Sequence, residues 1–264
     1  MDQLKLINLK KIYKNKNYEI IIKKSNFDKC FVFFSGNGLY FPNTNKEFNK
    51  KIIIDNRYEW KNLSKHINAK KIILLRDVHK IWYRKGINHK INNIDKVIAF
   101  IKKETEKFSE IVLIGSSAGG YIASIIGNHL KNSYVINFAG QIDLKLENIP
   151  LKKNKYFNII KKINKAKIFY FFSNKCKNDN LHFKIIKNKK NIIFLKFNST
   201  IHGPSILPIV LRKILKMSYE ELIEIKKNNK NLINPLKFSL SIVNPLSLII
   251  SWSIKHLKRI RYEQ

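Results

Sequence analysis

An apolar run that passes directly into a glycine-rich segment constrains this chain more than any other feature. Residues 110–114 are mostly aliphatic, and Gly115-Ser116-Ser117-Ala118-Gly119 follows them without a linker. The next segment, residues 121–130, carries isoleucines at helical spacing. Small residues on both sides of a serine let a strand and a helix approach each other closely. The pattern therefore predicts a buried strand, a sharp turn at Ser117 and a helix.

The first two-thirds of the chain repeats this alternation of short apolar runs and helical patterns. Strands are expected at residues 18–22, 30–34, 72–75, 111–114, 134–138, 168–172 and 192–197, with a weaker candidate at 51–54. Helices are expected over 94–101, where Asn93 can cap the first turn, and over about 206–215. Strands that are apolar on both faces are typical of parallel sheets covered by helices on both sides. The sequence predicts an α/β fold with a mainly parallel central sheet.

The chain is strongly basic, with 52 Lys and Arg against 18 Asp and Glu and a net charge of +34. Such a balance is found in proteins that bind nucleic acids or anionic membranes. Here the lysines are spread along the whole chain, and frequent Lys, Ile and Asn with scarce Gly and Pro are typical of AT-rich codons. We expect mainly a solvated surface, with peripheral contact to an anionic membrane as the alternative. No nucleic-acid-binding module is recognisable, so no specific nucleic-acid partner is expected.

The two cysteines and the N-terminus indicate the compartment. Cys30 and Cys176 are too few and too far apart for a disulfide framework or a metal-ligand motif. We expect both to be buried or unreactive, in a reducing compartment. The first residues contain no continuous apolar segment of the kind found in signal peptides. A cytoplasmic location is expected, with the inner face of the membrane as the peripheral alternative.

Ser117 is the main candidate for a nucleophile. The pattern Gly115-x-Ser117-x-Gly119 places a serine on a tight strand-to-helix turn, where its hydroxyl stands clear of the sheet. The positive end of the following helix then faces a developing oxyanion. Ser116, on the strand side of the turn, is the fallback. A plain phosphate-binding turn is the weaker interpretation, because the dinucleotide glycine pattern and the phosphate-loop lysine are absent from this segment.

A nucleophilic serine needs a base and an acid that orients the base. His202 follows the strand expected at 192–197, and we expect it to be the base. Asp179 follows the strand expected at 168–172 and is the main candidate for the acid, although an aspartate there could also cap a helix. Asp143, after the strand expected at 134–138, is the alternative acid.

The oxyanion hole needs a second backbone donor from a loop after an early strand. Ser35-Gly36-Asn37-Gly38 follows the strand expected at 30–34, and its glycines allow close approach to a substrate oxygen. We expect the amides of Asn37 and Ala118 to form the hole, with Gly36 and Gly38 supplying the geometry.

These motifs together resemble the α/β-hydrolase superfamily over about residues 15–216. The resemblance implies a sheet of the eight-stranded type, a Ser117–His202–Asp179 triad, and no metal or organic cofactor. Ser35-Gly36 stands where many esterases of that superfamily have His-Gly in the oxyanion loop, which leaves the class of hydrolase open.

A second resemblance concerns the substrate. Leu75-Arg76-Asp77 followed by Trp82-Tyr83 is similar to segments of hydrolase-like proteins of bacterial surface-glycan and capsule pathways. Arg76, Asp77, Trp82 and Tyr83 follow a strand at the sheet edge where open α/β sheets bind ligands, and an aromatic, charged rim suits a sugar. The expected function is an acyl hydrolase or acyltransferase acting on a small-molecule or glycan ester, such as an acylated polysaccharide precursor. A non-catalytic, hydrolase-like partner protein of a polysaccharide-biosynthesis or membrane-associated assembly is the alternative.

The C-terminal part differs from the rest. We expect a catalytic domain at 1–216, with only residues 139–166 available for a small lid, and a helical appendage at 217–264. Ser218 and Glu221 have the spacing of a capping box and predict a helix start. Residues 238–254 carry no charge and are followed by Lys and Arg. This segment is at the short limit for a membrane span, so packing on the domain or a partner, or contact with a membrane surface, is expected instead.

Overall fold

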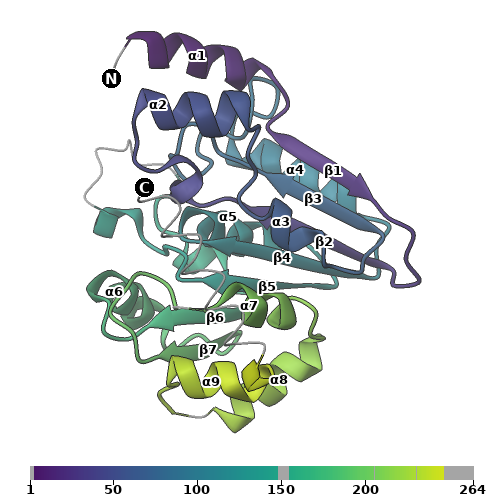
Figure 1. Ribbon diagram of the computed structural model, residues 1–264, viewed down its shortest axis with the longest axis vertical. Coiled ribbons are helices and arrows are strands. Elements are labelled where there is room, and N and C mark those ends of the chain that lie inside the picture. Colours follow the sequence, from purple (N-terminus) through teal and green to yellow (C-terminus); the bar gives the residue numbers. More distant parts are fainter. Residues whose placement is uncertain (1–2, 148–154, 205, 230, 247–264) are drawn as a thin grey trace.

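The computed structural model describes residues 3–147, 155–204, 206–229 and 231–246, and a single twisted sheet runs through its centre (Figure 1). The strands lie in the order β1-β3-β2-β4-β5-β6-β7. β1 is antiparallel to β3, and all other neighbouring strands are parallel. The strands are β1 (Tyr18–Ile22), β2 (Lys29–Phe34), β3 (Lys71–Leu75), β4 (Glu110–Ser116), β5 (Ser133–Phe138), β6 (Lys167–Ser173) and β7 (Ile192–Phe197). The predicted α/β fold with a mainly parallel sheet is confirmed.

Helices cover both faces of the sheet, as the apolar strands require. The helices are α1 (Gln3–Lys14), α2 (Asn45–Phe48), α3 (Lys61–Ser64), α4 (Ile94–Thr105), α5 (Ala118–Gly127), α6 (Lys177–Ile186), α7 (Pro208–Ile214), α8 (Tyr219–Asn228) and α9 (Pro235–Ile242). On one face, α4, α5 and α6 pack against alternate side chains of the strands, such as Val32 and Leu113. On the other face, α7, α8 and α9 pack against the intervening side chains, such as Phe33 and Phe171.

The sequence marks the starts of these helices. Asn93 accepts a hydrogen bond from the amide of Lys96 at the start of α4, and Ser218 forms a complete capping box with Glu221 at the start of α8. α5 begins at Ala118, immediately after Ser117, because the turn leaves no linker. α7 begins at Pro208, whose fixed φ suits the first turn of a helix.

The weaker strand prediction at 51–54 is wrong. This segment is a helical turn, Asn49–Ile54, that continues directly from α2. Ile52 is buried in a small cluster with Phe48, whereas Ile54 is 77% exposed. A half-buried strand would bury alternate side chains, whereas here Ile52 is the one buried isoleucine of the three. Packing of Ile52 against the core therefore outweighs the preference of isoleucine for strands.

The C-terminal helices join the main core in the described part of the chain. Leu222 of α8 and Phe238 of α9 belong to the same hydrophobic cluster as β6 and β7, and Phe238 packs edge-on against Phe197. Among the described residues, no helix is both long enough and apolar enough to span a membrane. The uncharged segment 238–254 is described only to residue 246, and the rest of it lies outside the described residues. The division at residue 216 stays a prediction.

The six parallel strands, β2 to β7, all end at one edge of the sheet, and the predicted site residues follow several of them there. The segments after β2, β4, β6 and β7 all leave from the carboxyl ends of neighbouring parallel strands (Figure 1). Seven strands in this order, with a sharp turn from β4 into α5, form the arrangement of the α/β-hydrolase fold, with one strand fewer in the described residues than the eight-stranded type.

Candidate active site

Ser117 occupies a strained turn between β4 and α5. Its backbone has φ +52° and ψ −120°, a conformation that non-glycine residues rarely adopt, and its amide donates to the carbonyl of Phe138 on β5. A Cβ at Gly115 would lie 2.2 Å from the backbone of Gly119, and one at Gly119 would lie 2.2 Å from the carbonyl oxygen of Phe34. The glycines are therefore required by close backbone contacts. Strain of this kind persists where the surroundings hold it, and it is concentrated at functional sites.

Asp179 and His202 form a hydrogen-bonded pair. Asp179 lies in the first turn of α6 and is fully buried, and its Oδ1 is 2.6 Å from Nδ1 of His202. Its Oδ2 accepts the amides of Ser173 and Gly203, each at 3.0 Å. The helix cap is Cys176, so Asp179 does not cap α6. The hydrogen bond that Nδ1 of His202 donates to Asp179 raises the pKa of His202, although burial of the ring opposes this shift.

The hydroxyl of Ser117 bonds to a residue that the sequence did not single out. Nε2 of Gln141 lies 2.9 Å from Oγ of Ser117, and among the described residues Gln141 is the partner recorded for this hydroxyl. Among the described residues, Ser117 and His202 form no hydrogen bond with each other. Nδ1 of His202 bonds to Asp179, and Nε2 of His202 has no hydrogen-bond partner among these residues. Gln141 follows β5 and is 24 residues from Ser117, and no motif marks it.

The predicted oxyanion loop lies against the turn. A Cβ at Gly36 would lie 2.7 Å from the carbonyl oxygen of Ser116, so the glycine allows this loop to pack closely on the end of β4. Asn37 begins a short helical turn, and Ala118 is the first residue of α5. The first amides of a helix have no acceptor within the helix, so the Ala118 amide suits the role predicted for it. The role of these amides stays a prediction.

A half-buried carboxylate also reaches this loop. Oε2 of Glu59 accepts the amide of Gly36 at 2.5 Å, and burial raises the pKa of this carboxyl group. Glu59 and His202 line the same small cavity of about 270 Å³, whose other walls are mostly apolar. The lining residues are Glu59, Trp60, Leu63, Ser116, Phe138, His202, Gly203, Pro204, Ile206 and Leu211. Sequence analysis missed Glu59, which precedes β3 and lies in no recognisable motif.

The four predicted substrate-binding residues are buried, with side chains directed to internal partners. Arg76 donates to Asn17 and to the carbonyl of Arg57, and its guanidinium lies 4.6 Å from the Tyr58 ring. Asp77 accepts backbone amides of the loop that follows it.

The two aromatic members of this set are also internally bonded. The indole of Trp82 donates to Oε1 of Gln141, and the hydroxyl of Tyr83 bonds to the carbonyl of Ser35. Both rings are at most 3% exposed. Their contact with substrate stays a prediction, and their burial favours a role in holding the loop.

The alternative residues lie apart from the pair. Asp143 accepts Nδ2 of Asn158 at 2.6 Å and the amide of Lys145, and it makes no contact with His202 among the interactions of the described residues. Ser116 is the last residue of β4 and contributes to the wall of the 270 Å³ cavity.

Cys176 lies beside the pair. Its sulfur and the ligand atoms of Asp179 and His202 are all within 4.8 Å of one another, a spacing that could hold a metal ion. However, the Asp179 carboxylate already accepts three hydrogen bonds. Burial raises the pKa of the half-buried Cys176 thiol, which disfavours the thiolate that a metal prefers. We therefore assign no metal to this cluster.

The other cysteine, Cys30, is buried in the core. Burial raises the pKa of its thiol to about 12, in agreement with its expected inertness.

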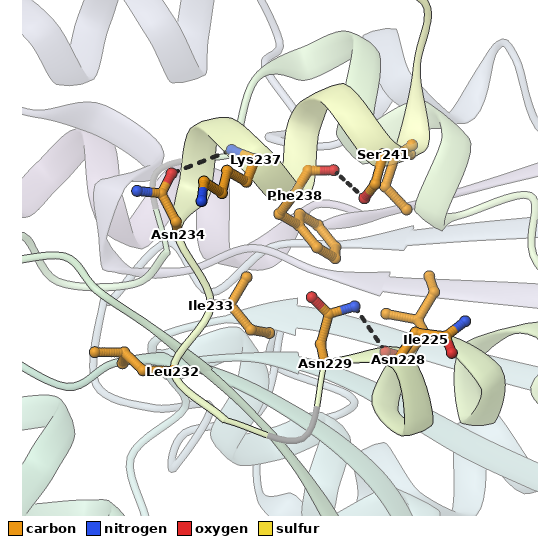
Figure 2. Close-up of a pocket in the computed structure, with 10 residues that line it drawn as sticks. Ile225, Asn228, Asn229, Leu232, Ile233, Asn234, Lys237, Phe238 and Ser241 are labelled. Carbon is orange, nitrogen blue, oxygen red and sulfur yellow. Dashed lines mark hydrogen bonds between the residues drawn. The ribbon is translucent and has the colours of Figure 1, made fainter.

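A larger cavity of about 520 Å³ lies at the C-terminal helices, away from the triad residues (Figure 2). Its polar groups support the local backbone: Asn234 caps α9, Asn229 donates to the carbonyl of Ile225, and Ser241 donates to that of Phe238 (Figure 2). None of the predicted site residues lines it. The smaller cavity, in contrast, is lined by two of the predicted residues, His202 and the fallback Ser116, but not by Ser117.

Comparison with known proteins gave structural similarities only. No protein-family model and no curated protein matches the chain. A capsule O-acetyltransferase of Neisseria meningitidis serogroup A is 17% identical, with 82% of this chain and 93% of that chain covered and a TM-score of 0.47. A lipase-esterase related protein from Clostridium acetobutylicum is 16% identical, with 81% and 100% covered and a TM-score of 0.46. An alpha-beta serine hydrolase homologue from Coxiella burnetii is 11% identical, with 75% and 88% covered and a TM-score of 0.43. Similarities this remote define no activity.

Proposed function

We propose that this chain is a serine-dependent acyl hydrolase or acyltransferase whose nucleophile is Ser117. The observation that carries the proposal is the Asp179–His202 pair at 2.6 Å, located at the same sheet edge as the strained turn of Ser117. The side chain of His202 is 40% exposed, so its ring can reach a substrate. The side chain of Asp179 is buried and can hold the ring in place.

The chemistry follows from these positions. Oγ of Ser117 forms a bond to the ester carbonyl carbon while its proton passes to Nε2 of His202. Asp179 stabilises the resulting imidazolium, and the amides of Asn37 and Ala118 donate to the oxyanion. The carbon–oxygen bond of the ester then breaks, and His202 returns the proton to the leaving alcohol. Water or a sugar hydroxyl attacks the acyl-enzyme and gives its proton to His202. The bond between the acyl carbon and Oγ then breaks, and His202 returns the proton to Oγ of Ser117.

The cavity that His202 and Ser116 line is the proposed site of the acyl group. A volume of about 270 Å³ is below the range of pockets for drug-sized ligands, and its walls are mostly apolar. We propose a short acyl group on a glycan or small-molecule ester. The glycan part rests on the sequence resemblance of the segment at residues 75–83.

The test uses a fluorophosphonate probe and a panel of acetyl and longer-chain esters, including O-acetylated sugars. The wild-type chain should be labelled covalently, and Ser117→Ala should lose labelling and about 10⁴-fold or more of its turnover. Ser116→Ala is the matched control, because it removes the neighbouring hydroxyl, and it should stay labelled. Labelling and turnover of folded Ser117→Ala at the wild-type level would overturn the proposal.

A second candidate function follows from the bond between Ser117 and Gln141. Since the hydroxyl contacts Gln141 and not His202, the chain could be a hydrolase-like partner protein without activity. A folded wild-type chain that is neither labelled by the probe nor active on any ester of the panel would favour this candidate.

A further inference from the structure

We propose that Gln141 is a positioning residue that sets the direction of the Ser117 hydroxyl, and that Trp82 in turn sets the orientation of the Gln141 amide. This inference deepens the proposed function and rests on it. It also gives a role to Asp77 and Trp82, which the sequence singled out but the proposed chemistry does not use.

The direction of the hydrogen bonds fixes the orientation of the amide. An indole N–H only donates, so the Gln141 atom that lies 3.0 Å from Nε1 of Trp82 must be the oxygen. Nε2 of Gln141 therefore faces Ser117, where it donates to Oγ at 2.9 Å; the Ser117 hydroxyl also donates to Oε1, in a longer contact of 3.4 Å. When Oγ accepts this bond, its own proton is left for a base. The contact with Oε1 is the longer and weaker of the two, so the hydroxyl proton can leave it for His202.

The backbone around Gln141 is held on both sides. The amide of Gly140 donates to Oδ1 of Asn137 at 2.6 Å, and the amide of Ile142 donates to Nδ1 of His182 at 3.2 Å. His182 is buried, and its Nε2 lies 2.9 Å from Oε1 of Glu147. A Cβ at Gly140 would lie 2.6 Å from the backbone of Gly120, so this segment packs directly on the first turn of α5. Gln141 therefore has little freedom relative to Ser117.

The loop that carries Trp82 is held by a buried carboxylate. Oδ1 of Asp77 accepts the amide of His79 at 3.0 Å, and Oδ2 accepts those of Ile81 and Tyr83 at 2.8 Å. Trp82 and Tyr83 both have positive φ, at 59° and 56°. Such conformations are costly and persist when neighbouring bonds fix them. Asp77 thus maintains a strained loop that presents the indole N–H to Gln141.

The hydrogen bond between Trp82 and Gln141 is buried. Trp82 is 3% exposed and Gln141 is 2% exposed. Hydrogen bonds are stronger away from water, and leaving a buried donor or acceptor without a partner is costly. Hydrogen bonds from a second residue that orient a reacting group are a general means of preorganisation.

The experiment compares Gln141→Met with Gln141→Glu. Both side chains are close to glutamine in length, but methionine removes the donor, whereas glutamate replaces the donor by an oxygen that can accept the Ser117 proton. Labelling by the fluorophosphonate is measured as a second-order rate from pH 5 to pH 9, with thermal unfolding to verify the fold. Gln141→Met should label about 5-fold more slowly, since one neutral hydrogen bond is lost.

Gln141→Glu provides the decisive readout. Dividing its labelling rate by that of Gln141→Met at each pH isolates the effect of the carboxyl group at position 141, including its effect on His202. This ratio should fall at least 10-fold as the pH rises and the introduced carboxyl group ionises, because the carboxylate then competes with His202 for the hydroxyl proton. A role in packing alone would lower the rates without a pH-dependent ratio. A ratio independent of pH, or wild-type rates in both folded variants, would overturn the proposal.

Trp82→Phe tests the second step while it keeps an aromatic ring in the site. The amide of Gln141 loses its fixed orientation, so labelling should slow about 2- to 5-fold, and a wild-type rate in this folded variant would overturn the role of the indole. These outcomes are distinguishable from failure of the proposed function, in which the wild-type chain itself is not labelled or labelling does not depend on Ser117.

Discussion

The substitution Asp179→Asn tests the triad more sharply than removal of the side chain. Oδ2 of Asp179 accepts two buried amides, those of Ser173 and Gly203. An asparagine must therefore place its oxygen toward these amides, and its NH₂ group toward His202. A donor then faces Nδ1 of His202, which can answer only as an acceptor. The ring is forced into the tautomer that carries its proton on Nε2, and it cannot take the proton of Ser117.

The structure sets the magnitude. To restore the productive tautomer, the asparagine would have to rotate its amide and leave the amides of Ser173 and Gly203 without an acceptor. Each buried unsatisfied amide costs about 1–3 kcal/mol, so the total is about 2–6 kcal/mol. At 1.36 kcal/mol per tenfold, kcat/KM should fall between about 30-fold and 2 × 10⁴-fold.

The assay is the hydrolysis of an activated ester, followed together with the fluorophosphonate labelling rate and thermal unfolding. The matched control is Asp143→Asn, which alters the alternative acid and should retain wild-type rates. Folded Asp179→Asn with less than a 10-fold loss would refute the role of Asp179. A large loss in Asp143→Asn with little change in Asp179→Asn would transfer the role to Asp143.

Two further predictions concern pH. The hydrogen bond to Asp179 raises the pKa of His202, and a general base must be unprotonated, so kcat/KM should fall as the pH drops through a midpoint above 6.5. A midpoint below 6.5 in the wild-type pH–rate profile would contradict this. Burial also raises the pKa of Glu59. Its carboxylate accepts a hydrogen bond from the amide of Gly36, beside the predicted oxyanion hole. Glu59→Gln keeps an acceptor for that amide and removes a negative charge, so its kcat/KM should exceed the wild-type value about 2- to 10-fold above the pKa of Glu59 and approach it at lower pH. A ratio of one across the pH range would show that Glu59 does not influence the oxyanion.

Much of the fold could be predicted because local patterns and tertiary packing agree. The strands at 111–114 and 134–138 are apolar on both faces, and the structure buries them on both faces. Helix starts could be predicted where a polar cap is present, as at Asn93 and Ser218. The segment 51–54 could not, because burial of Ile52 against Phe48 depends on a neighbouring helix that the local pattern does not reveal.

The triad candidates and the other site residues differ in how sequence could find them. Ser117, Asp179 and His202 each follow a predicted strand at the same sheet edge, so their order along the chain was sufficient to suggest a pairing. Gln141 and Glu59 act through contacts with residues 24 and 23 positions away, and glutamine or glutamate in a loop matches no motif. Only the three-dimensional arrangement brings their polar atoms to the site.

Asp77 and Asp179 show why sequence position alone does not separate a structural carboxylate from a candidate catalytic one. Both are buried, and both accept backbone amides near the carboxyl ends of strands. Asp77 uses its two oxygens on three amides of its own loop. In Asp179, Oδ2 accepts the amides of both Ser173 and Gly203, and Oδ1 bonds to His202. Because parallel strands end in loops whose amides need acceptors, this edge of the sheet collects carboxylates for both purposes. What distinguishes them is whether an oxygen remains for another side chain after the backbone has been satisfied.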